Sequence, residues 1–112
     1  MIPWTNETYE ITLEGIALEA GMKVYAVFWQ QDVSVLVPCE IGEGGTVSCA
    51  LTQEQSGKFR PSRVTDTEEG FFAPPEEMVH MQINVIADGK RIGSDVYSEI
   101  VYPQGWRKPL GG

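Results

Sequence analysis

The chain has 112 residues, of which 42% are hydrophobic, and its eight Lys and Arg against sixteen Asp and Glu give a net charge of −8. This length predicts one domain with one core, and the composition is typical of a folded soluble protein rather than a disordered or membrane-embedded one. The negative charge argues against nucleic acid and anionic membranes as partners, because both are bound through clusters of cations.

The first ten residues, MIPWTNETYE, contain neither a basic segment nor an apolar one, so no signal peptide is expected. The longest apolar stretch runs from Val24 to Trp29, which is the length of a strand and not of a membrane span. We therefore expect synthesis in a cytoplasm.

The first half of the chain alternates apolar and polar residues, as half-buried strands do. Pro38 predicts an edge strand or a bulge, since proline cannot donate a ladder hydrogen bond. Trp29 lies in the most apolar strand, and we expect it to be buried. The predicted strands are YEITLEG (residues 9–15), KVYAVFWQ (23–30), VSVLV (33–37) and TVSCALT (46–52).

Cys39 and Cys49 flank the segment EIGEGGTVS, whose glycines predict a hairpin centred near Gly44. The two sulfur atoms would then lie on neighbouring strands, roughly opposite each other, so a cross-strand disulfide is geometrically possible. In a reducing compartment two buried free thiols are expected instead. Two cysteines are too few for a disulfide scaffold or, on their own, for a zinc site.

The segment LTQEQSGKF (51–59) contains the helical signal of the chain. Thr52 is followed three residues later by Gln55, which is the spacing of a capping box. Gly57 would end the helix after about one turn. We therefore predict a short helical crossover.

Residues 60–77, RPSRVTDTEEGFFAPPEE, show little periodicity and predict a long loop. Phe71 and Phe72 in this loop either pack back onto the core or form an apolar anchor for a partner. The carboxylates of DTEEG (66–70) lack the alternating ligand pattern of an EF-hand, so only weak calcium binding is conceivable there.

The segment VHMQINVIADGKRIGSDVYSEIVY (79–102) predicts a hairpin that turns at Asp88-Gly89, because glycine accepts the positive φ of a two-residue turn. His80 falls on its polar face beside Gln82 and Asn84, and the sequence identifies no partner for it. On the other face, the alternation directs six apolar side chains toward the core: Met81, Ile83, Val85, Ile92, Val96 and Ile100.

The combined pattern predicts an all-β fold, namely an antiparallel immunoglobulin-like β-sandwich of about six to seven strands with one short helical crossover. A small barrel is the alternative. Residues 1–102 would form the domain and residues 103–112 a C-terminal tail. The tail is aromatic and basic at Trp106, Arg107 and Lys108, which makes these residues candidate contacts for an acidic neighbouring subunit.

The sequence lacks the residue constellation of an enzyme. It contains one histidine and no GxSxG nucleophile elbow, and the GEGG segment (42–45) is not followed by the Lys-Ser/Thr of a phosphate loop. We therefore expect no catalytic residues, no metal and no cofactor.

Four segments together, MIPWTNETYEITLEG, KVYAVFWQ, LTQEQSGKF and VHMQINVIADGKRIGSDVYSEIV, resemble small β-sandwich proteins encoded among the tail and baseplate genes of tailed phages and prophages. The N-terminal domains of upper baseplate proteins are similar in the same regions. The long loop at 60–77 departs from the usual pattern, in which the chain enters the final hairpin more directly.

The resemblance implies a structural or assembly protein without catalysis or cofactor, which would reside in the bacterial host cytoplasm during assembly and then in the virion. Its expected partners are other structural proteins of the particle, or further copies of itself. The alternative is a carbohydrate- or protein-binding module that uses exposed aromatic rings, with five candidates: Trp4, Trp29, Phe71, Phe72 and Trp106.

Overall fold

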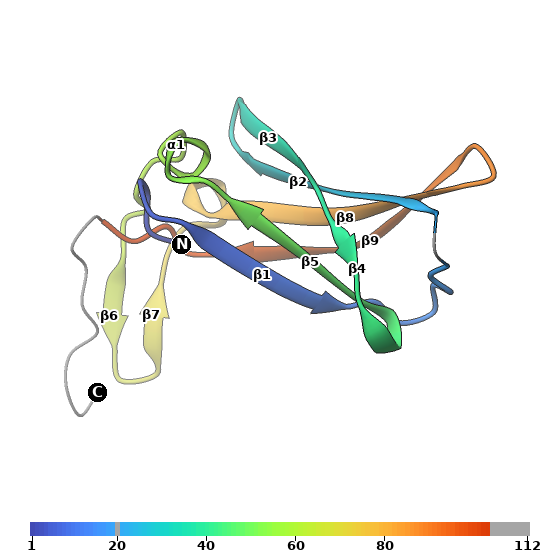
Figure 1. Cartoon of the computed structure of the whole chain (residues 1–112). Coiled ribbons are helices and arrows are strands. Elements are labelled where there is room, and N and C mark those ends of the chain that lie inside the picture. Colours follow the sequence, from blue (N-terminus) through green and yellow to red (C-terminus); the bar gives the residue numbers. More distant parts are fainter. Residues whose placement is uncertain (20, 104–112) are drawn as a thin grey trace.

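The computed structural model describes residues 1–19 and 21–103 and is an all-β sandwich, as predicted (Figure 1). One layer is a three-stranded sheet in the order β1 (Glu7–Thr12), β5 (Thr46–Leu51), β4 (Glu40–Ile41). The other is a four-stranded sheet in the order β3 (Val33–Pro38), β2 (Lys23–Gln30), β8 (Val79–Ala87), β9 (Lys90–Glu99). All neighbouring strands are antiparallel.

This strand order is that of an immunoglobulin-like sandwich. In the three-stranded sheet, β1, β5 and β4 correspond to strands B, E and D of that fold. In the four-stranded sheet, β3, β2, β8 and β9 correspond to strands C′, C, F and G. The chain passes from the four-stranded to the three-stranded sheet between β3 and β4, at Cys39.

The core lies between the two sheets and is built from the inward-facing residues of β2, β3, β5 and β8, with half-buried residues of β1 packed against it. Phe28 is completely buried there, and its ring packs against that of Tyr9 from the opposite sheet, with centroids 5.1 Å apart. Around this pair lie mainly β-branched side chains: Val24, Val35, Val37, Val47, Val79, Ile83 and Val85. Such residues pack well on pleated strands, which is why these segments form a sheet.

The local turn and helix signals are confirmed. Helix α1 (Gln53–Ser56) has the complete capping box, since the Gln55 N–H donates to the Thr52 hydroxyl at 3.2 Å and the Thr52 N–H to the Gln55 side chain at 2.9 Å. The β8–β9 turn has positive φ at both Asp88 (51°) and Gly89 (74°), as a two-residue hairpin turn requires. The segment between β4 and β5 turns through the 3₁₀ helix η1 (Glu43–Gly45), which contains Gly44.

Residues 60–77 contain more structure than the sequence indicates. They include a small hairpin of β6 (Thr65–Thr67) and β7 (Gly70–Phe72), followed by the 3₁₀ helix η2 (Pro75–Glu77). Strands of three residues are too short to show a periodicity, so they could not be predicted from the sequence pattern. In Figure 1 this hairpin projects from one end of the sandwich, beside the start of β1.

The final hairpin departs from strict alternation, and the prediction for β9 was wrong in part. Met81, Ile83 and Val85 are buried as expected, but Ile92 and Val96 are 44% and 51% exposed, and Ile100 is half-buried. The cause is a β-bulge: Gln82 pairs with Val96 and Asn84 with Gly93, so two residues of β9 lie opposite one residue of β8. The extra residue moves Val96 to the outer face. Ile92 stays on the inner side, but β9 is an edge strand and leaves it partly uncovered.

Candidate interaction surface

The outer faces of the two sheets differ sharply in chemistry. On the three-stranded sheet the outward positions alternate with the core positions and are polar, as is usual for a solvated face. They are Thr8, Glu10, Thr12, Glu40, Thr46, Ser48 and Ala50.

The outer face of the four-stranded sheet, here called the outer face, is apolar and aromatic at its centre. The register arranges it in four rows across the strands: Lys23–Ile86–Arg91, Pro38–Tyr25–Asn84–Gly93, Leu36–Val27–Gln82–Val96 and Ser34–Trp29–His80–Ser98. Leu36 and Val96 at the two ends of the third row are 63% and 51% exposed. A soluble sandwich normally places polar residues at such positions, so this face requires an explanation.

The outer face contains no carboxylate, although the chain has sixteen Asp and Glu residues. Its charged residues are Lys23 and Arg91, both in the row at one end. Apolar and aromatic residues without carboxylates are typical of the buried centre of a protein–protein interface.

Trp29 is half-buried on the outer face, so the expectation that it is buried was wrong in part. Its ring lies beside that of His80, with centroids 5.7 Å apart. The unbroken apolar run from Val24 to Trp29 indicates an apolar outward face. A strand that is apolar on both sides has only one side covered in a two-layer sandwich.

His80 has two partners that the sequence did not reveal. Its Nδ1 lies 2.6 Å from the Ser98 hydroxyl and its Nε2 lies 3.1 Å from the Pro75 carbonyl oxygen. A neutral imidazole with its proton on Nε2 satisfies both contacts, since it donates to the carbonyl and accepts from the hydroxyl. These two contacts join β8, β9 and η2.

Gly93 allows the side chains of Gln82 and Asn84 to lie against β9. A Cβ atom at position 93 would stand 2.7 Å from the Gln82 side-chain nitrogen, which donates to the Ser94 carbonyl at 2.8 Å. Asn84 is 1% exposed and its Oδ1 accepts no hydrogen bond within the described part of the chain. These two amides are polar residues within the two central rows of the outer face, and Asn84 is covered there.

The two phenylalanines of the β6–β7 hairpin differ in burial: Phe71 packs back onto the protein, and Phe72 is exposed. Phe71 is half-buried and its ring packs edge-on against Tyr102, with centroids 6.3 Å apart. Phe72 is 50% exposed. The other candidate contacts of the sequence, Trp106, Arg107 and Lys108, lie outside the described residues.

Trp4 is exposed and lies at the α1 end of the sandwich. Its ring covers Gly57 so closely that a Cβ atom there would stand 2.4 Å from the ring carbon Cδ2. The aromatic candidates at the surface do not form one cluster, since Trp4 precedes β1, Trp29 lies on β2 and Phe72 on β7. Tyr25 is the aromatic residue that shares the outer face with Trp29.

Clusters of metal ligands and membrane-spanning helices are absent from residues 1–19 and 21–103. No group of three or more His, Cys, Asp or Glu side chains there is placed to hold a metal ion. None of the helices in this part of the chain has the length and apolar character that crossing a bilayer requires.

Comparison with known proteins adds no relative, since no protein-family model, curated protein or solved structure matches the chain significantly.

Proposed function

We propose that the protein is a non-enzymatic structural or assembly protein of a phage or prophage particle, of the tail or baseplate, which acts through protein–protein contacts on its outer face. The observation that carries the proposal is this apolar, carboxylate-free face on a strongly acidic protein. The assignment to a particle comes from the family resemblance of the four sequence segments.

The chemistry of the outer face specifies the partner. Tyr25, Val27 and Trp29 would lie at the desolvated centre of the contact, where aromatic and apolar groups contribute most. Lys23 and Arg91 at one end would face carboxylates of the partner, which steers the two surfaces into register. The expected partner is a neighbouring structural protein of the particle with an apolar patch bordered by acidic residues.

The proposal is tested by expressing tagged protein in the induced host and analysing purified particles by mass spectrometry. We expect the wild type in the particles and the double variant Leu36→Glu/Val96→Glu to be depleted at least tenfold, because each glutamate places a charge in the apolar contact. Both side chains are exposed, so the variant should fold normally.

The matched control is Thr8→Glu/Ala50→Glu, which adds the same charge to exposed positions on the other sheet. This control should be incorporated like the wild type. Absence of the wild-type protein from the particles would refute the particle assignment. Equal incorporation of both double variants would refute the role of the outer face.

A second candidate function is favoured by one observation, the half-buried rings of Trp29 and Tyr25 on the same outer face. Aromatic rings on a flat sheet face also bind sugar rings, so the alternative is a carbohydrate-binding module. It predicts binding on a glycan array that is lost in Trp29→Ala. An array without hits for the wild type would exclude it.

A further inference from the structure

We propose that Cys39 and Cys49 form a redox-responsive dithiol, which a small disulfide oxidant converts into a cross-strand disulfide at the junction between the two sheets. Both cysteines are free thiols in the structure. The proposal does not depend on the proposed function, because it rests on the geometry of the β3–β4–β5 segment.

The strand register places the two cysteines directly opposite each other. β4 and β5 pair with Glu40 opposite Ser48 and Ile41 opposite Val47, and one further step along the ladder sets Cys39 opposite Cys49. The Gly42 N–H donates to the Thr46 carbonyl at 2.7 Å, so by alternation the cysteine pair is a non-hydrogen-bonded one. In such pairs the Cα atoms are about 4.5 Å apart, which lies within the range that disulfides span.

The side chains also point toward each other. Cys49 is part of the buried core, and Cys39 is half-buried and packs against the same core. The neighbouring Cys39 thiol lowers the pKa of the Cys49 thiol, and the neighbouring Cys49 thiol raises the pKa of the Cys39 thiol. The thiolate is the form that attacks disulfides.

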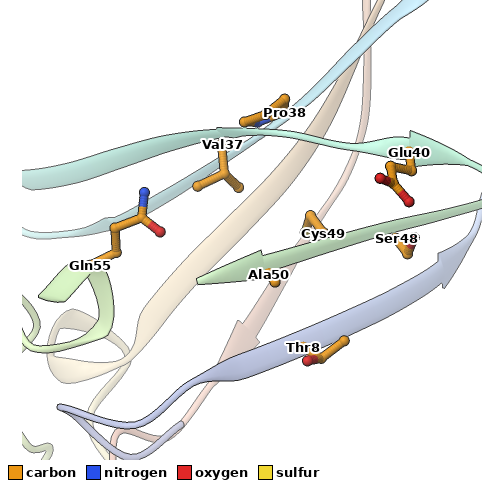
Figure 2. Close-up of a pocket in the computed structure, with 8 residues that line it drawn as sticks. All are labelled: Thr8, Val37, Pro38, Glu40, Ser48, Cys49, Ala50 and Gln55. Carbon is orange, nitrogen blue, oxygen red and sulfur yellow. The ribbon is translucent and has the colours of Figure 1, made fainter. Parts of the chain in front are cut away.

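A groove gives small molecules access to this pair. It has a volume of about 380 Å³, is open to solvent, and Cys49 is among the residues that line it. Figure 2 shows Cys49 on β5 and Val37 on β3 pointing toward one another, with Gln55 of α1 at one end of the groove. A small disulfide reagent that enters this groove therefore reaches the Cys49 side chain.

The reaction is thiol–disulfide exchange with a low-molecular-weight disulfide, RSSR. The first cysteine thiolate attacks one sulfur of RSSR, forms a mixed disulfide and releases RS⁻, which takes up the displaced proton. The second cysteine thiolate then attacks the protein sulfur of the mixed disulfide and releases a second RSH. The two cysteines are oxidised by two electrons, and RSSR is reduced to two RSH.

The position of Cys39 gives the bond its structural consequence. The Cys39 N–H donates to the Val24 carbonyl of β2 at 2.8 Å, although its side chain lies opposite Cys49 of the other sheet. Residue 39 thus belongs to both sheets, and the disulfide would fix covalently the point where the chain crosses between them. Closing the 39–49 loop also restricts the unfolded chain, which stabilises the folded state.

The experiment uses the full chain, purified with a reductant that is then removed, and oxidised glutathione as the reagent. Before oxidation the denatured protein should titrate two thiols, as in the structure. Afterwards we expect none, a loss of two hydrogen atoms in the intact mass, a monomer on a non-reducing gel, and a Tm higher by roughly 5–15 °C. Dithiothreitol should reverse all four changes.

The control variants are Cys39→Ser and Cys49→Ser, each of which should take up one glutathione at most and show no rise in Tm. If either variant fails to fold, peptide mapping of oxidised wild-type protein still decides the matter. Peptides containing Cys39 and Cys49 joined to each other support the proposal. Two titratable thiols after oxidation, glutathione on both cysteines, or cross-linked dimers would each overturn it.

Discussion

Gln30 lies at the end of β2, is 5% exposed, and holds the 60–77 segment against the sandwich through three hydrogen bonds of its amide. Its Nε2 donates to the carbonyls of Arg60 at 2.7 Å and Glu77 at 2.8 Å, and its Oε1 accepts from the Arg60 N–H at 2.7 Å. Ser62 supports the same segment, since its hydroxyl donates to the Glu77 carbonyl and accepts from the Val101 N–H. These bonds explain how a segment with short strands keeps a defined position.

Replacing Gln30 by Ala should destabilise the fold by about 2–4 kcal/mol, because the Arg60 N–H and carbonyl lose their partner at a partly buried place and the Glu77 carbonyl keeps only Ser62. Urea unfolding measures the change. The control is Gln31→Ala, since Gln31 is exposed and donates one long bond of 3.4 Å. The control should change stability by less than about 0.5 kcal/mol. Equal effects in the two variants would contradict the anchoring role.

Tyr9 of β1 joins the three-stranded sheet to β9 of the four-stranded sheet. Its hydroxyl donates to the Glu99 carboxylate of β9, whose other oxygen lies 3.5 Å from the Met1 amino group. Burial and the neighbouring Glu99 raise the pKa of the Tyr9 hydroxyl well above its usual range. In the unfolded chain the same hydroxyl ionises near pH 10. The unfolded state therefore releases this proton first, and the stability that Tyr9 contributes is lost as the pH rises above about 10.

The variant Tyr9→Phe should lower the free energy of unfolding at pH 7 by about 1–2 kcal/mol, through the lost hydrogen bond. It should also show a shallower loss of stability above pH 10 than the wild type. Urea unfolding at a series of pH values from 7 to 11 measures both effects. Tyr97→Phe, at an exposed position on β9, is the control and should follow the wild type. Parallel pH curves for Tyr9→Phe and the wild type would disprove the linkage.

At the scale of elements, the β9 bulge is the feature that most changes the surface. The Ser94 hydroxyl accepts from the Ile83 N–H at 3.0 Å and donates to the Asp95 carbonyl at 2.8 Å, so it replaces a ladder bond that the bulge removes. The bulge shifts the alternation and places Val96 in the same row as Val27. A local irregularity of one residue therefore contributes directly to the outer face.

Ser94→Ala should cost about 1–2 kcal/mol of stability, because the buried Ile83 N–H is left without an acceptor. Thermal or urea unfolding measures this change against Ser34→Ala, which removes a hydroxyl from an exposed position on β3. Hydrogen exchange at Ile83 gives a site-specific reading and should accelerate in Ser94→Ala alone. Unchanged exchange at Ile83 would show that the hydroxyl does not support the bulge.

At the scale of the whole molecule, the charges are distributed unevenly over the sandwich. The three-stranded sheet exposes threonine, serine and glutamate, whereas the outer face of the four-stranded sheet exposes apolar rings and aliphatic groups with two cations at one end. The net charge of −8 keeps the separate chain in solution, and the outer face is the region where carboxylates do not oppose close contact. The same asymmetry would give the proposed partner one preferred side of the molecule.

The sequence by itself determined the local elements of this protein. Three features depend only on neighbours within a few residues: the capping box at Thr52, the Asp88-Gly89 turn, and the alternation in β1 and β3. They can therefore be read from the sequence alone. The opposition of Cys39 and Cys49 was likewise predictable from a symmetric hairpin. The all-β class follows from the same short-range pattern.

Only the tertiary structure decided which apolar residues reach the surface and which polar ones are buried. An unbroken apolar strand such as β2 does not show which of its faces the second layer covers, and the bulge in β9 reverses the facing of Val96 without a clear mark in the sequence. Gln30 and Ser56 are buried polar residues whose hydrogen-bond partners lie 47 and 51 residues away along the chain. The local sequence therefore does not show that these side chains have partners. The outer face is therefore a property of the packed sheets, since it arises from the pairing of four strands and the absence of a covering layer in the described chain.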